Sequence, residues 1–361
     1  MAHVATITID HTKVPGDLTD YVGLIVPDGS AGYSALYALC LEGGGDIRLF
    51  KSDDTTELAR EIVTFSVSAE TGEIHYRYAG TLSSSVDTDI HVYADGSSSD
   101  YAVTATYGRN NVWTDYVSVW HMSESNATRV DSTGNNDMPQ FNSVLSGTGK
   151  IGNGADFERS NSEYLRITDA AQTGLDMPGD FTLQTWYELE TASIVQVFAS
   201  KSAFPAIGMQ WYLDSSNKLF CFASSDGATS QRSAWGTTAA IPTSGLHLQH
   251  LTFDAPASGN PTVTFYIDGA SVAGGTAWAS GMSGGMSNNS NNFAIASEPG
   301  QTGNSLDGIL DEMRIRTGLL LDNHIAAEYN NQNSYSTFYS VAAVAGGSAA
   351  QAARRGVIMM M

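Results

Sequence analysis

The stretch GLHLQHLTFDA, residues 245–255, decides the fold of most of this chain. It places His247 and His250 three positions apart, the spacing of a metal-chelating pair when both imidazoles lie on one side of a helix. Apolar and polar residues instead alternate with a period of two, and a turn sequence, ASGNP, follows. This alternation predicts a β-strand, in which residues an odd number apart point to opposite faces of the sheet. We therefore expect no metal at the two histidines.

Similar strand signals recur about every ten residues, separated by clusters of Gly, Asp, Asn and Ser. VATITID (residues 4–10) and EIHYRYAG (residues 73–80) both alternate as half-buried strands do. Helical patterns are few. DTTELAREI (residues 54–62) predicts one or two helical turns, and LDNHIAAEYNNQ (residues 321–332) predicts a short helix behind an Asp-Asn start. The fold class expected is all-β.

Composition and charge exclude several classes of function. The chain has 361 residues, 38 acidic and 17 basic side chains, and a net charge of −21. A polyanionic partner would be repelled, so we expect no nucleic acid binding. A run of about eighteen apolar residues, the length needed to cross a bilayer, is absent from the sequence, and the N-terminus lacks the pattern of a secretion signal. Cys40 and Cys221 lie in apolar runs, which predicts buried free thiols.

Residues 245–255 and six other segments of the sequence resemble segments of the laminin-G-like, concanavalin A-type jelly roll. The resemblance covers about residues 118–331. Seven segments keep the order of that family: VWHMSES, VDSTGNND, GKIGNGADF, GDFTLQTWYELE, GLHLQHLTFDA, PTVTFYIDGASV and SLDGILDEMRIRTGLLLDNHIAAEY. Residues 5–110 resemble a domain of uncharacterised function found ahead of such jelly rolls in bacterial surface and phage proteins.

These resemblances imply two β-sandwich domains, at residues 1–110 and 111–335, the second a concanavalin A-like jelly roll. Residues 336–361 are rich in Ala, Gly and Ser and end in ARRGVIMMM. A segment of this composition has few large apolar side chains to bury, so we predict a flexible tail. Its basic and then apolar end could instead dock against a neighbouring subunit.

The jelly-roll resemblance also implies one structural Ca²⁺, held by Asp131, Asp311 and backbone carbonyls near Gly154. Carboxylate and carbonyl oxygens are the ligands that calcium prefers. The alternative is that Asp131 caps a turn and Asp311 lies at the surface. Both alternatives stay open from the sequence.

Paired carboxylates raise the question of catalysis. In TWYELE, Glu188 and Glu190 share a predicted strand face with Gln184 and Trp186, and two residues of strand rise put them about 6.6 Å apart, a spacing that glycosidases use. Glucanases of this fold carry a longer Glu-x-Asp-x-x-Glu pattern, which is absent here. We therefore expect a solvated or sugar-contacting face and no enzyme activity, with a jelly-roll glycoside hydrolase as an alternative.

The function expected is that of a non-enzymatic structural protein on a virion surface, in a capsid, tail or fibre, with contact to host cell-surface glycans. Its partners would be neighbouring virion subunits, reached through the tail, in a homo-oligomer. A bacterial cell-surface adhesin, and so an extracellular location, is the alternative. The candidates for sugar stacking are four tryptophans, Trp186, Trp211, Trp235 and Trp278, although a tryptophan more often packs in the core or in a hairpin, and no spacing selects a binding set among them.

Overall fold

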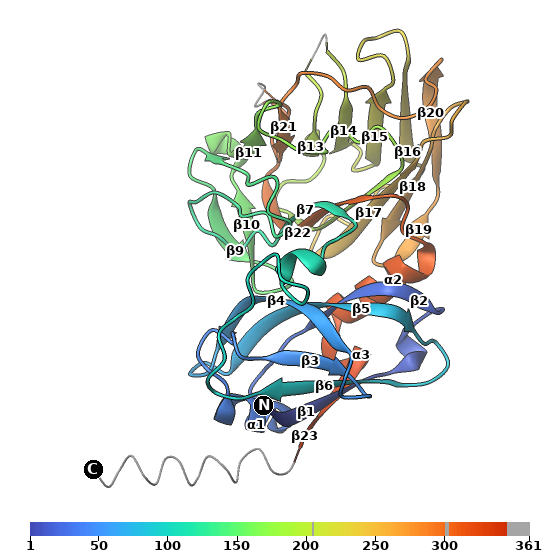
Figure 1. Cartoon of the computed structure of the whole chain (residues 1–361). Helices are drawn as coiled ribbons and strands as arrows, with labels where there is room; N and C mark the ends of the chain where they lie inside the picture. Colours follow the sequence, from blue (N-terminus) through green and yellow to red (C-terminus); the bar gives the residue numbers. More distant parts are fainter. Residues whose placement is uncertain (204–205, 300–302, 345–361) are drawn as a thin grey trace, which may run out of the picture. The chain divides into compact units, whose positions relative to one another are not determined.

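The computed structural model describes residues 1–203, 206–299 and 303–344. The chain divides into two compact units (Figure 1). Unit 1 comprises Met1–Thr114 together with Ala326–Met361, and unit 2 comprises Asp115–Ile325. Antiparallel strands dominate both units, as the sequence predicts for an all-β protein. Each unit encloses a buried apolar core of its own.

Unit 1 is built on one antiparallel sheet of seven strands in the order β2-β5-β4-β3-β6-β1-β23. The sheet curls around the buried apolar cluster of the unit (Figure 1). Its strands are β1 (Ala2–Ile9), β2 (Leu18–Ile25), β3 (Arg48–Lys51), β4 (Glu57–Ser66), β5 (Thr71–Leu82), β6 (Thr88–Ala94) and β23 (Tyr339–Ala343).

The prediction of helical turns at residues 54–62 is wrong, because most of this stretch belongs to the strand β4. It pairs with β3 on one side and β5 on the other, and Leu58 points into the core. Glu, Leu, Ala and Arg favour helices when isolated, but backbone pairing on both sides and burial of one face override that preference. The helix expected at residues 321–332 is confirmed as α2 (Asp322–Asn333). The other helices are α1 (Ser34–Leu39) and α3 (Tyr335–Phe338).

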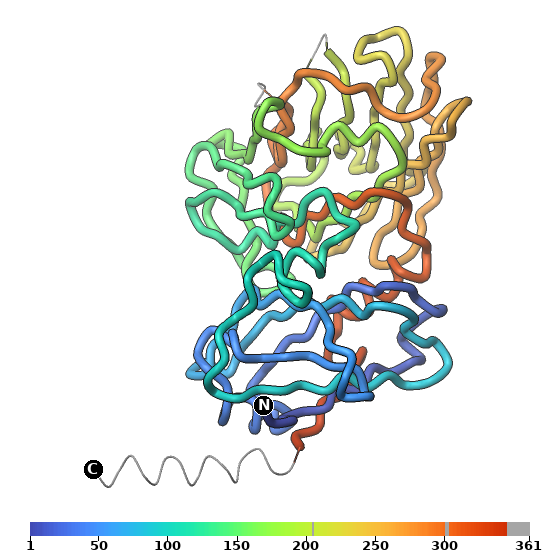
Figure 2. Tube along the Cα trace, in the orientation of Figure 1, coloured from blue at the N-terminus to red at the C-terminus, as the bar shows by residue number. Residues whose placement is uncertain are grey.

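The strand β23 shows that the tail begins later than the sequence suggests. Residues 336–344 were expected in the flexible tail, but β23 runs antiparallel to β1 in the register Ile9↔Tyr339 to Ala5↔Ala343. Figure 2 shows the dark blue start and the red end of the chain side by side. The edge of β1 offers unpaired backbone groups, and the alternating stretch after Phe338 satisfies them. Residues 345–361 lie outside the described residues.

The second half of α2 also belongs to unit 1. The Asn331 side-chain amide donates to the Leu24 carbonyl at 3.0 Å, and its oxygen accepts from the Leu24 backbone N–H at 2.7 Å. This pair of bonds imitates a neighbouring strand at the edge of β2, whose backbone groups need partners when buried. Two segments from the C-terminal part of the chain, α2 and β23, thus complete the N-terminal unit.

We predict that a chain ending at Phe338 is less stable than a chain ending at Val344. The shorter chain loses β23 and the buried ring of Tyr339, and an aromatic truncation of this kind costs about 3–5 kcal/mol in a core. Thermal unfolding followed by circular dichroism would compare the two. Equal melting temperatures would show that β23 contributes nothing to unit 1.

Unit 2 is a sandwich of two antiparallel eight-stranded sheets. The first has the order β19-β18-β17-β12-β22-β10-β9, with β7 also paired to β22, and the second has the order β20-β16-β15-β14-β13-β21-β11-β8. The strands of the first sheet are β7 (Tyr116–Trp120), β9 (Leu145–Thr148), β10 (Asn153–Phe157), β12 (Phe181–Leu189), β17 (His247–Asp254), β18 (Thr262–Ile267), β19 (Ala270–Val272) and β22 (Gly308–Thr317). Those of the second are β8 (Gln140–Phe141), β11 (Tyr164–Ile167), β13 (Gln196–Ser200), β14 (Met209–Leu213), β15 (Leu219–Ser224), β16 (Arg232–Thr237), β20 (Gly274–Ser280) and β21 (Phe293–Ile295).

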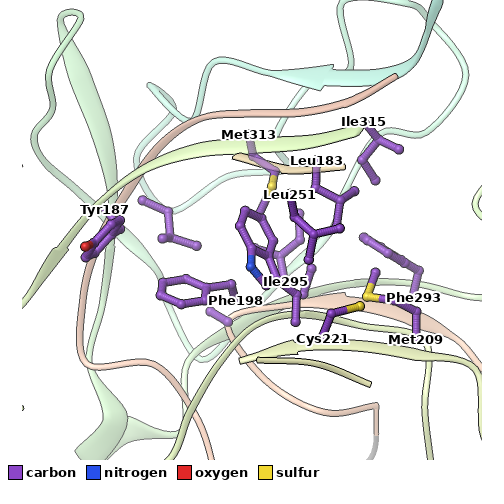
Figure 3. Packing of buried hydrophobic residues seen from close by; sticks show 14 of the residues in the cluster. Leu183, Tyr187, Phe198, Met209, Cys221, Leu251, Phe293, Ile295, Met313 and Ile315 are labelled. Atoms are coloured by element: carbon purple, nitrogen blue, oxygen red, sulfur yellow. The ribbon is translucent and has the colours of Figure 1, made fainter. Parts of the chain in front are cut away.

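The core of unit 2 forms where alternate residues of the two sheets face one another. Figure 3 shows apolar side chains from both sheets in this layer, Leu183, Leu251, Met313 and Ile315 from the first and Met209, Cys221, Phe293 and Ile295 from the second. The prediction that alternate residues of β12 form an apolar face is confirmed, because Phe181, Leu183, Tyr187 and Leu189 all belong to the core.

The register of β17 answers the histidine question. Leu251 pairs with Leu183 in the core, so His247, an even number of residues away, lies on that face and His250 on the other. The Nδ1 atom of His247 lies 2.7 Å from an Asp268 carboxylate oxygen, and His250 is fully buried opposite Gln184. The two imidazoles do not converge, as the alternation predicts.

Cys40 and Cys221 are both buried free thiols, as the sequence predicts. Among the described residues, none of the helices has the length and apolar character needed to cross a membrane.

Candidate functional site

The loop that resembles the family's calcium segment is organised by Asp131. Its two carboxylate oxygens accept five hydrogen bonds within the loop and from the neighbouring strand β7. The donors are the backbone N–H groups of Val119, Thr133, Asn135 and Asn136, at 2.8 to 3.3 Å, and the Thr133 hydroxyl at 2.7 Å. Asp131 is fully buried. A buried carboxylate that satisfies this many donors holds the turn by itself, which favours the turn-capping alternative.

We predict that Asp131→Ala destabilises unit 2 by about 2–4 kcal/mol, because it leaves buried N–H groups without an acceptor. Asp131→Asn retains an acceptor oxygen and should lose less. Chemical unfolding of the wild type and both variants measures the loss of stability, and thermal unfolding of the same proteins with and without EDTA tests for a bound cation. If EDTA lowers the melting temperature of the wild type and not that of Asp131→Ala, the residue holds a cation as well as a turn.

The second predicted calcium ligand, Asp311, lies fully buried on β22, not at the surface as the alternative proposed. One carboxylate oxygen accepts from the backbone N–H groups of Lys150 and Ile151, at 2.7 and 2.9 Å. Burial raises the pKa of Asp311 well above its usual range, the neighbouring Glu312 raises it further, and these two N–H donors oppose the shift.

Gly154, the third member of the predicted set, lies in β10 beside residues 309–311 of β22. A Cβ added at Gly154 would lie 2.8 Å from the Leu310 carbonyl and 3.2 Å from the Asp311 Cβ, so only glycine fits there. Asp311 and Gly154 are therefore adjacent. In the described ranges, no group of three or more metal-ligating side chains includes Asp131 or Asp311, and calcium at this set stays a prediction.

A different group of carboxylates comes together near the end of β12. Asp156, Glu158 and Glu190 each place an oxygen within 4.8 Å of the others. The pKa of each is raised, first by desolvation and then by the neighbouring carboxylates, which include Asp307. Such a group is electrostatically costly at neutral pH and would be relieved by a proton or a hard cation.

Glu188 and Glu190 lie close together as predicted, but the rest of their predicted face is not solvated. Glu188 lies in β12 and Glu190 directly after it, and Glu188 is among the charges that raise the pKa of Glu190. The face that they share with Gln184 and Trp186 was expected to be solvated, but both of those side chains are buried. The ammonium of Lys150 lies 5.1 Å from the centre of the Trp186 ring.

Three of the four tryptophans proposed for sugar stacking are core residues. Trp186, Trp211 and Trp235 are at most 1% exposed, which removes them as surface contacts. Trp278, on β20, is 42% exposed. It is the one member of the predicted set that a ligand can reach in the described structure.

Trp278 belongs to a row of side chains that crosses four strands on the outer side of the second sheet. Register pairs join Gln210 of β14 to Phe222 of β15, Phe222 to Ala234 of β16, and Ala234 to Trp278. Because Ala234 is small, the rings on either side reach across it, with centroids 5.7 Å apart. The row thus presents the rings of Phe222 and Trp278, with the side-chain amide of Gln210 at one end.

A second row runs parallel to the first. Tyr212 pairs with Phe220, and their rings stack with centroids 5.5 Å apart and an interplanar angle of 18°. Phe220 in turn pairs with Gly236, where an added Cβ would lie 2.5 Å from the Phe220 ring, so the ring lies flat on the strand. Burial raises the pKa of Tyr212 to about 12, which keeps its hydroxyl protonated.

The guanidinium of Arg232 lies beside these two rows. We name the whole surface the aromatic face; its members are Gln210, Tyr212, Phe220, Phe222, Arg232 and Trp278. The guanidinium carbon of Arg232 lies 5.1 Å from the centre of the Trp278 ring and 5.8 Å from that of Phe222. This arrangement is within the range of a cation–π contact. Apart from Trp278 the members are half-buried, so their rings are fixed by neighbours and still meet solvent.

A separate pocket of about 370 Å³ lies beside the Asp131 loop. Asn135, Asp137, Phe141 and Arg166 contribute to its lining. The Arg166 guanidinium lies 4.6 Å from the centre of the Phe141 ring. The pocket combines a flat apolar surface with charged groups of both signs.

The members of the aromatic face other than Trp278 were missed from the sequence. Their alternation with core residues in MQWYL and LFCFAS is visible in the sequence, so their sharing of an outer face could have been read from a period of two. Their alignment into rows depends on the register of four strands, which spacing alone does not give.

Residues 159–326 match the family model of the concanavalin A-like lectin/glucanases superfamily, laminin G type 3. No match was found among curated proteins. Among solved structures, domain 4 of AbnA, an extracellular GH43 arabinanase from Geobacillus stearothermophilus, solved in complex with arabinotriose, is 18% identical, with a TM-score of 0.42 over 59% of this chain and 97% of that one.

Two toxin domains are similar at lower identity. The binding domain of Paraclostridial Mosquitocidal Protein 1 is 14% identical with a TM-score of 0.45, and the receptor-binding domain of botulinum neurotoxin mosaic serotype C/D is 10% identical with a TM-score of 0.46. Each match covers 62% of this chain and 52% of the toxin domain, so the chain spans about half of their length. Residues 159–326 thus match the concanavalin A-like lectin/glucanases superfamily, and unit 2, which holds all but the last of them, has the two-sheet architecture expected of a concanavalin A-like jelly roll.

Proposed function

We propose that this chain is a non-enzymatic glycan-binding protein and that its jelly roll contacts sugar through the aromatic face. The observation that carries the proposal is the row from Gln210 through Phe222 and Ala234 to Trp278, which ends in a 42% exposed indole. The superfamily named for lectins and glucanases is consistent with it.

The chemistry of the aromatic face suits a sugar better than a wholly apolar ligand. One side of a pyranose ring presents C–H groups, which pack on the face of an aromatic ring, while its hydroxyls need hydrogen-bond partners at the rim. Gln210 and Arg232 supply such partners at opposite ends of the rings. A contiguous apolar patch on the surface, rimmed by polar side chains, is typical of an interaction site.

The rigidity of the aromatic face also favours binding. Phe220 is fixed by Gly236 beneath it and Tyr212 beside it, and Phe222 is held between Arg232 and Trp278. Side chains already held in the bound arrangement lose little conformational entropy when a ligand arrives. A flat, ordered set of rings is therefore ready to accept an extended oligosaccharide.

We predict that Trp278→Ala weakens binding to a glycan found on a glycan array at least tenfold, about 1.4 kcal/mol, because it removes the most exposed stacking surface. Leu321→Ala, which shortens a side chain 63% exposed elsewhere in unit 2, is the matched control and should bind as the wild type does. Isothermal titration with the selected glycan measures both. Unchanged affinity in Trp278→Ala would place the sugar elsewhere, and the pocket at Arg166 would be the next site to test.

The second candidate function is glycoside hydrolysis, and the raised pKa of Glu190 is the observation that favours it. A glycosidase needs one carboxyl group that stays protonated near neutral pH and one that stays ionised. Glu188, two residues before Glu190 in the chain, would be the second carboxyl group.

A panel of polysaccharides with reducing-end detection separates the two candidates. We expect no release of reducing ends by the wild type. Release by the wild type that disappears in Glu188→Gln and in Glu190→Gln would establish the hydrolase and overturn the non-enzymatic proposal.

We further propose that the protein is displayed on a virion surface as part of a homo-oligomer, with residues 345–361 as the contact to neighbouring subunits. The net charge of −21 supports an outward-facing position, since a surface packed on nucleic acid would be basic. A bacterial cell-surface adhesin is the alternative. An electron micrograph of the source particle, labelled with antibody to this protein, distinguishes the two locations.

A further inference from the structure

A cluster of metal-ligating side chains lies on the outer side of the unit 1 sheet, away from the aromatic face in sequence and in function. His3 of β1, His91 of β6 and Asp54 of the turn after β3 each offer a ligand atom, and these atoms lie within 4.8 Å of one another. The two imidazole rings have centroids 4.3 Å apart. The two histidines are half-buried and Asp54 is exposed, so an ion has access from solvent.

An irregularity in β1 aims His3 at this cluster. The register between β1 and β6 shifts between His3 and Ala5, which marks a β-bulge. Val4 and Ala5 are both fully buried, and His3 instead contacts the Thr6 hydroxyl at 3.1 Å. In a regular strand His3 and Thr6, three apart, would lie on opposite faces. Bulges of this kind redirect a side chain and are frequent beside functional sites.

A second irregularity positions Asp54. Its φ is +56°, a left-handed conformation that few residues other than glycine adopt, in a tight turn where its N–H donates to the Lys51 carbonyl. The turn directs the carboxylate toward β6, where the His91 Nδ1–H donates to it at 2.5 Å and the Tyr93 hydroxyl at 2.8 Å.

The hydrogen bonds also indicate where an ion would bind each imidazole. The Nε2–H of His3 donates to the Ala5 carbonyl at 3.0 Å, since a carbonyl can only accept, which leaves Nδ1 unprotonated in the neutral ring. The Nδ1–H of His91 faces Asp54, so an ion bound by both the Asp54 carboxylate and the His91 ring would take the place of this Nδ1 proton. Neutral imidazole is the form that binds metals.

We propose that His3, Asp54 and His91 bind a divalent transition metal ion of the zinc class. Two imidazoles and one carboxylate are a ligand set that zinc accepts, with a further position left for water or another donor. Calcium and magnesium, which take oxygen ligands, are not expected here. The site is independent of glycan binding by the jelly roll.

Two further clusters of ligating side chains provide the controls. Asp10, His11 and Asp87 form an exposed or half-exposed group in the same unit, with one imidazole instead of two. Asp156, Glu158 and Glu190 form an all-carboxylate group in unit 2. A site of the kind proposed prefers zinc to calcium and is insensitive to changes in either of these groups.

The experiment is isothermal titration of the full chain, purified without a histidine tag and dialysed against chelator, with Zn²⁺ and separately with Ca²⁺. We expect one tight Zn²⁺ per chain, and at least a tenfold loss of affinity in each of His3→Gln, His91→Gln and Asp54→Asn. His11→Gln is the matched control and should bind Zn²⁺ as the wild type does. Because the three ligands lie on the outer side of the sheet, circular dichroism of each variant should match the wild type.

The visible absorption of bound Co²⁺ gives a second readout that reports the ligands themselves. We expect a ligand-field spectrum in the wild type and in His11→Gln that is lost in His91→Gln. No Zn²⁺ binding at micromolar concentration would overturn the proposal. So would affinity unchanged in both His3→Gln and His91→Gln, or a loss of affinity in His11→Gln alone.

Discussion

The interaction on which the jelly roll depends is the packing of alternate side chains of two sheets against each other. Leu183 and Leu251, neighbours in register on β12 and β17, meet Met209 and Cys221 of the opposite sheet in one dry layer (Figure 3). Burying a side chain of this size stabilises a fold by about 1.5–3 kcal/mol. Since successive side chains of a regular strand point to opposite faces, the same packing dictates which residues of these strands lie outside the core.

The aromatic face follows from this constraint. Met209 and Trp211 of β14 point into the core, so Gln210 and Tyr212 point out, and Cys221 of β15 does the same for Phe220 and Phe222. What distinguishes this surface from an ordinary polar exterior is the choice of residues at the outward positions. Small residues on β16 let rings from the neighbouring strands meet above it. Large apolar groups kept at the surface are costly for solubility, and the proposed sugar ligand would account for them here.

Much of the fold could be predicted because a period of two can be read directly from residues. The strand assignment at 245–255, the apolar face of β12 and the helix α2 all rest on local patterns. Two strands that could not be predicted from the sequence, β4 and β23, depend on pairing with other strands. β4 is made by pairing on both sides, and β23 by the open edge of β1, some 330 residues earlier in the chain. Neither partner can be inferred from local propensity.

The candidate sites were less predictable than the fold for the same reason. The sequence could not tell that Asp131 would satisfy five donors, that Trp186 would be buried, or that a bulge would turn His3 toward His91. Among the sugar-stacking candidates, only the exposure of Trp278 distinguished a surface ring from a core ring. Burial and register are properties of the assembled sheets, and a residue type by itself carries neither.

Nuclear magnetic resonance of the indole N–H groups tests the central claim most directly. The chain has six tryptophans, of which Trp278 is the exposed one and the other five are buried. When the glycan selected on the array is titrated into the protein, we expect a large shift of the Trp278 indole signal and little change in the other five signals. A Trp278 signal that stays in place while the glycan binds would contradict it.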